Sequence, residues 1–148
     1  MKQPNFVHRQ LSMDLKKEIC MVFSATKEDA LKQALSYIKE GSSVSWGGSM
    51  SVSEIGLMDA LKEGNYHLID RSVAKNFDEQ REIFSKAVLS DYFLMSSNAI
   101  TLDGELINID GTGNRVACLS YGPKHVIMIV GMNKVVNDVE DGIKRVRN

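Results

Sequence analysis

Short apolar runs alternate with segments of helical period along this chain, and this alternation restricts the possible folds more than any single motif does. Each run has the length of one strand, and each longer segment spaces its apolar residues three and four apart, as one helix face requires. We expect strands at residues 19–23, 44–46, 66–69, 92–95 and 126–130. Strands that alternate with helices form a mainly parallel sheet covered on both faces, so the predicted class is α/β.

Helices are expected between these strands, at residues 27–40, 78–90 and 116–121. Gly41 ends the first of them. Ser51 and Glu54 form a capping-box pattern that predicts the start of another helix. The closing helix is expected to carry one apolar stripe, made of Val135, Val136, Val139, Ile143 and Val146.

A β-hairpin is predicted around Asp103-Gly104. Apolar or β-branched residues flank this pair, which is typical of a type I′ turn because that turn needs positive φ at both central positions. We expect the hairpin to project from the main sheet.

Length and charge restrict the class of protein further. The 148 residues fit a single domain, 1–148, in which residues 1–18 form an N-terminal lead-in segment. Eighteen Lys and Arg against nineteen Asp and Glu give a formal charge of -1, which argues against a nucleic-acid binder. The apolar stretch at 126–130 is too short for a membrane span, and residues 1–10 lack the apolar region of a signal peptide. The protein is therefore expected to be soluble and cytoplasmic.

The cysteines and histidines predict no metal site. Cys20 and Cys118 lie far apart and form no C-x-x-C motif, so we expect two reduced, packed thiols. His8, His67 and His125 have no metal-ligand spacing.

Polar residues follow four of the predicted strands, where the carboxyl ends of parallel strands bind ligands. They are Gly47, Gly48 and Ser49 after the second strand, Asp70 and Arg71 after the third, Ser96, Ser97 and Asn98 after the fourth, and Asn133 and Lys134 after the last. The sequence therefore predicts one polar rim.

Gly47-Gly48-Ser49 comes directly before a predicted helix, and its bare backbone N–H groups suit a phosphate or carboxylate. The alternative is a tight turn in which Ser49 or Ser51 simply caps the helix. The motif is neither a Walker loop nor G-x-G-x-x-G, which removes the usual support for nucleotide binding.

A second glycine loop contains Asp110, Gly111, Gly113, Asn114 and Arg115. The glycines allow a ligand close to the backbone, Arg115 can clamp an anion, and Asp110 can act as an acid or base. The alternative is that Asp110 ties down the loop and Arg115 forms a surface ion pair.

Three motifs in order together resemble the LUD domain, the lactate-utilization domain of LutC-like proteins. They are GSSVSWGGSMSVSEIGLMDAL at 41–61, SDYFLMSSNAITLDGELINIDGTGNRVACLSYGPK at 90–124 and VGMNKVV at 130–136. The resemblance extends from about residue 27 to 148. It implies a three-layer α/β/α fold of the NagB/RpiA/CoA-transferase type and a role in bacterial oxidation of L-lactate to pyruvate beside iron–sulfur subunits.

On this hypothesis the rim binds a small hydroxy or keto acid. Arg115 and Lys134 hold its carboxylate, Gly48 and Ser49 donate from the helix end, and Asn98 and Asp110 orient the hydroxyl. The chain encodes no electron acceptor, so the acceptor is expected on a partner or as a bound cofactor of unknown identity.

Two alternatives belong to other functional classes. One is a non-catalytic metabolite-binding or regulatory subunit. The other is a sugar-phosphate isomerase or acyl-transfer enzyme of the same fold, because residues 92–115 are distantly similar to methylthioribose-phosphate isomerases. Asn98 stands where those enzymes carry a catalytic aspartate, and an amide cannot exchange a proton as a carboxylate does.

Overall fold

A computed structural model describes residues 20–147 and places a four-stranded parallel sheet at the centre of the chain. The strand order is β2-β1-β3-β6, and all three pairings are parallel. The strands are β1 (Ser43–Trp46), β2 (His67–Ile69), β3 (Tyr92–Met95) and β6 (His125–Met128). This sheet confirms the α/β class.

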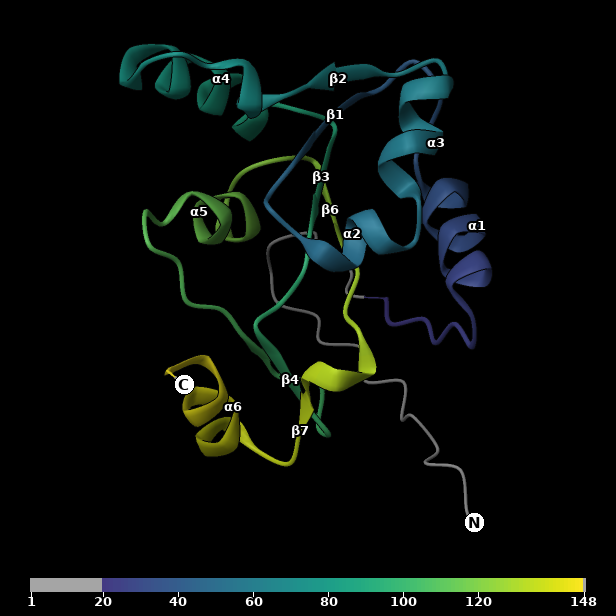
Figure 1. Cartoon of the computed structure of the whole chain (residues 1–148), viewed down its shortest axis with the longest axis vertical. Helices are drawn as coiled ribbons and strands as arrows, with labels where there is room; N and C mark the ends of the chain where they lie inside the picture. The colour runs from purple at the N-terminus through teal and green to yellow at the C-terminus, as the bar shows by residue number, and fades with distance from the viewer. Residues whose placement is uncertain (1–19, 148) are drawn as a thin grey trace.

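Helices cover both faces of this sheet. Figure 1 shows α1 (Lys27–Tyr37) and α3 (Leu57–Glu63) on one side, and α4 (Phe77–Val88) and α5 (Asn114–Ser120) on the other. Two short helices, α2 (Met50–Glu54) and η1 (Arg71–Val73), follow β1 and β2. The arrangement is consistent with three α/β/α layers.

Strand β3 supplies side chains to both hydrophobic cores, since successive residues of a strand point to opposite faces. Tyr92 and Leu94 pack with α1, α2 and α3, whereas Phe93 and Met95 pack with Cys118 of α5. All four are buried, which explains why this strand is apolar without alternation.

A second, smaller sheet lies beyond the main one (Figure 1). Its order is β5-β4-β7, formed by β4 (Ala99–Thr101), β5 (Leu106–Ile107) and β7 (Val135–Val136). The last helix, α6 (Val139–Arg147), packs closely on it, since a Cβ built on Gly142 would lie 2.7 Å from Ile107 Cδ1. Residues 96–98 connect the two sheets.

The hairpin is confirmed, but its predicted turn type and position are wrong. Its loop has three residues, 102–104, and Gly104 N donates to Thr101 O at 3.0 Å. Gly104 has φ 87, and no residue other than glycine within 20–147 has positive φ, so the turn is not type I′. The hairpin pairs with β7 in the second sheet instead of projecting from the first.

Two helix starts differ from the predictions. Val135 and Val136 form β7, because they pair in parallel with Ile100 and Thr101, and α6 begins only at Val139. Ser49, not Ser51, caps α2: its hydroxyl accepts a hydrogen bond from Val52 N at 3.3 Å.

Two predicted strands also differ. Ile19 lies outside the described residues, while residues 20–23 form no strand and expose the side chains of Met21, Val22 and Phe23. The strand predicted at residues 126–130 forms β6, which begins at His125 and is an edge of the sheet with half-buried side chains and an exposed His125. The helix predicted to start near Ser51 is divided into α2 and α3 by Gly56, which has φ 75. The other elements match their predicted positions to within about three residues, and residues 1–18 lie outside the described part. Within residues 20–147, no helix is sufficiently long and apolar to cross a membrane.

Candidate functional site

A pocket of about 290 Å³ opens at the carboxyl ends of the main strands. The loops after β1 and β3, the start of η1, the loop before α5 and the first turn of α5 supply its lining. It consists of Gly47, Gly48, Arg71, Asn98, Asp110, Asn114 and Arg115. All of these except Arg71 are residues to which the sequence analysis gave a role in the site. The fold therefore brings six of them to one place, while their roles in binding remain predictions.

Arg115 is tied to its surroundings by several hydrogen bonds. Its Nε donates to Asp110 Oδ1 at 2.8 Å, and its Nη1 donates to Ser96 O at 2.9 Å. Its Nη2 donates to Asn98 Oδ1 and to Ile109 O. Arg115 does form the ion pair of the alternative prediction, with Asp110, but the pair does not lie on the surface, since the two side chains are only 14% and 8% exposed. Four of its five donors are occupied within the protein.

Asp110 holds the start of α5 in place. The N-cap of this helix is Gly113, which has no side chain to satisfy the first N–H groups. Asp110 Oδ2 accepts from Val116 N at 2.7 Å instead, while its Oδ1 binds Arg115. With 8% of its side chain exposed and both oxygens occupied, Asp110 behaves as a structural anchor of the glycine loop.

Lys134 lies beside this pocket without lining it. Its Nζ donates to Ser96 Oγ at 2.7 Å and to Ser51 Oγ at 3.5 Å, and it forms no ion pair with a carboxylate of residues 20–147. Burial, together with the charges of Arg145 and Arg115, lowers the pKa of Lys134.

Arg145 joins two of the rim loops from α6. It donates to Asn98 O at 3.2 Å and to Asn133 O at 3.4 and 3.3 Å. Asn133 is exposed and contributes its carbonyl here, away from the pocket lining.

The remaining predicted residues have structural positions around the pocket. Ser49 caps α2, Gly111 is exposed, and Gly113 adopts the left-handed conformation with φ 76. None of the three lines the pocket. Gly47 does, but its N–H is already bonded to Leu94 O at 2.9 Å, which leaves the exposed Gly48 as the more accessible backbone.

Arg71 is the pocket residue to which the sequence analysis gave no role beyond its place at the rim. It begins η1 directly after β2, and its guanidinium forms no hydrogen bond or ion pair within the described residues. A Cβ built on Gly48 would lie 3.5 Å from Arg71 Nη2, so the guanidinium faces bare backbone. Its position directly after a predicted strand was the sequence feature that could have identified Arg71 as a pocket residue.

The two cysteines have different environments. Burial raises the pKa of Cys118 to about 11, as expected for a packed thiol, whereas Cys20 is exposed, and its prediction as a packed thiol is wrong. No group of three or more His, Cys, Asp or Glu suited to a metal occurs within residues 20–147.

We expect native protein to have one fast and one slow thiol, since the thiolate is the reactive form and Cys118 is both protonated and covered. Ellman's reagent with Cys20→Ser and Cys118→Ser checks this. Cys118→Ser should retain the fast phase, and a fast reaction in Cys20→Ser would contradict the burial of Cys118.

Comparison with family models identifies the family of this chain. The chain matches the model of the LUD domain over residues 9–148, and it is a member of that family. Membership supports a role related to lactate utilization. No curated protein and no solved structure matches the chain.

Proposed function

We propose that the rim pocket binds the anion of a small hydroxy or keto acid, with L-lactate and pyruvate as the first candidates. The observation that carries this proposal is Arg71, a guanidinium in the pocket lining without a partner in residues 20–147. A planar guanidinium matches a carboxylate through two parallel hydrogen bonds. Because Arg115 is held by protein acceptors, Arg71 is the main carboxylate ligand in this proposal.

The charge and donors of the pocket support this ligand class. Arg71 and Arg115 face a single carboxylate, Asp110, so the lining has a surplus of one positive charge. Asn98 Oδ1 and Asn114 Oδ1 accept hydrogen bonds from Arg115, which leaves the two side-chain NH₂ groups as donors. These amides suit the hydroxyl or keto oxygen beside the carboxylate of such an acid.

In the lactate-oxidising form of this proposal, the chain works with iron–sulfur partner subunits. Conversion of L-lactate to pyruvate removes two electrons and two protons: in this proposal the electrons pass to the iron–sulfur subunits and the protons are released to solvent. The chain contributes the binding and orientation of the acid.

A non-catalytic binding subunit is the second candidate, and the state of Asp110 favours it. Both carboxylate oxygens of Asp110 are occupied, by Arg115 and by the start of α5. No other carboxylate of residues 20–147 lines the pocket, so the described lining supplies binding groups more readily than a proton acceptor.

We expect Arg71→Ala to weaken binding of L-lactate or pyruvate roughly ten- to a hundredfold, since a hydrogen bond to a charged group contributes about 1.5–3 kcal/mol. Titration calorimetry measures the affinity, and thermal unfolding should change little because the side chain is exposed and has no partner within residues 20–147.

Arg81→Ala is the matched control, because it removes the same charge from the exposed face of α4. Wild-type affinity in Arg71→Ala, or the same loss in Arg81→Ala, would remove Arg71 from the site. Failure of wild-type protein to bind either acid would reject this ligand class.

A further inference from the structure

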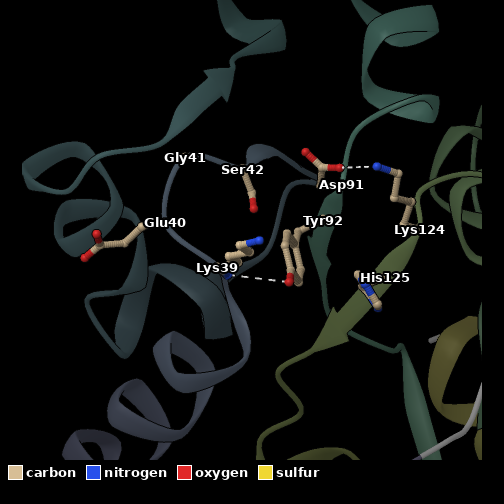
Figure 2. Close-up of a pocket in the computed structure, with 8 residues that line it drawn as sticks. All are labelled: Lys39, Glu40, Gly41, Ser42, Asp91, Tyr92, Lys124 and His125. Atoms are coloured by element: carbon tan, nitrogen blue, oxygen red, sulfur yellow. Dashed lines mark hydrogen bonds and ion pairs between the residues drawn. The ribbon is translucent and has the colours of Figure 1, made fainter.

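A second hollow, of about 390 Å³, lies at the opposite end of the main sheet (Figure 2). The loop from α1 to β1, at residues 39–42, forms one wall, and the starts of β3 and β6 form the other. We propose that this hollow binds a second small organic anion through its carboxylate or phosphate group. The site is distinct from the rim pocket and does not depend on the function proposed for it.

Three donors in this hollow have no acceptor within residues 20–147. Ser42 is only 9% exposed, and its hydroxyl forms no hydrogen bond in the described part of the chain. The Lys39 ammonium has no ion pair there. Tyr92 Oη accepts from Lys39 N at 3.4 Å, which leaves its own proton to donate. Figure 2 shows the Ser42 hydroxyl and the Lys39 ammonium turned toward Tyr92.

The carboxylates of the lining do not satisfy these donors. Asp91 Oδ1 accepts from Lys124 Nζ at 2.7 Å, and its Oδ2 accepts from Ser43 N and Ser43 Oγ at 2.9 and 2.8 Å. The Lys124 hydrogen bond, with those from Ser43, holds the pKa of Asp91 well below its usual range. Glu40 is exposed, and its carboxylate points away from the other lining residues in Figure 2. The hollow therefore offers three unpaired donors around Tyr92, while the carboxylate of Glu40, which has no partner within residues 20–147, points away from them. Such a group of donors suits an anion.

The aromatic wall of the hollow is fixed in position. Tyr92 stacks on His125 of the neighbouring strand, with ring centroids 4.9 Å apart. The volume lies within the usual range of small-molecule sites, about 300–1,000 Å³. Tyr92 begins β3, and the rim pocket follows the other end of this strand, so the two hollows are separated by roughly 13 Å of strand.

The test is a titration of ¹⁵N-labelled full-length protein with inorganic phosphate and, separately, with acetate. We expect one of these anions to give saturable amide shifts at residues 39–42 and 91–92. Lys39→Gln and Ser42→Ala should each weaken that binding, by roughly tenfold for Lys39→Gln because it removes a charged donor. Phosphate binding alone assigns phosphate esters to the hollow, and acetate binding alone assigns carboxylates.

Lys32→Gln is the matched control, since it removes the same charge from an exposed position on α1. The absence of saturable shifts with both anions overturns the proposal, and so does an equal effect of Lys39→Gln and Lys32→Gln. Because Arg71 lies at the rim, Arg71→Ala should leave these shifts unchanged. Failure of this site and failure of the rim site are therefore separate results.

Discussion

Arg115→Ala should destabilise the protein by about 1–3 kcal/mol, the effect of leaving partly buried acceptors without their charged donor. The substitution leaves Asp110, with 8% of its side chain exposed, without its cation. It also removes the donors to Ser96 O, Asn98 Oδ1 and Ile109 O. Urea unfolding at neutral pH measures the loss, and the glycine loop before α5 should lose its order together with the pair.

Two controls separate this effect from a simple change in charge. Arg81→Ala, at an exposed position, should change the free energy of unfolding by no more than about 1 kcal/mol, the contribution of its cation–π contact with Phe77. Arg115→Lys should recover little of the lost stability, because a single ammonium group cannot reach all the acceptors that surround the planar guanidinium. If Arg115→Ala were as stable as Arg81→Ala, the network around Arg115 would not contribute to folding.

Leu94→Ala should lower the free energy of unfolding by about 2–5 kcal/mol, because apolar burial is lost and a cavity remains. Leu94 is fully buried in β3 and packs against the helices on the α1 and α3 side of the sheet. Thermal and urea unfolding should both report the loss. Leu102→Ala removes the same atoms from the hairpin loop, where the side chain is 61% exposed, and should be nearly neutral. Equal losses in the two variants would contradict the central position of Leu94.

The two arginines of the rim pocket have different roles, one in the stability of the fold and one in the proposed ligand binding. Arg115 belongs to the scaffold, because its acceptors are protein atoms. Arg71 is exposed and unpartnered among the described residues, so it is available to a ligand. Substitutions at these two positions should therefore separate stability from binding: Arg115→Ala acts mainly on folding, and Arg71→Ala acts mainly on affinity.

The sequence alone determined the features that depend on local pattern. Buried side chains recur at regular intervals along a strand or helix, so burial can be read from the sequence pattern. This holds for the apolar run at Tyr92–Met95 and for the helical period of α1 and α4. The three motifs, taken in order, indicated the LUD family, and the match to the family model confirms it. The polar residues after the strands likewise predicted most of the rim pocket, since parallel strands end at one edge.

Only the tertiary structure decided which groups are paired with one another. Val135 and Val136 have an apolar pattern that suits a helix, but pairing with Ile100 and Thr101 makes them a strand. Arg71 and Arg115 are the same residue type in similar polar settings. Arg115 is held by acceptors from residues 96, 98, 109 and 110, whereas the Arg71 guanidinium lies against the bare backbone of Gly48 and has no hydrogen bond or ion pair within residues 20–147. Such pairings depend on contacts between segments distant in sequence, and local periodicity cannot predict them.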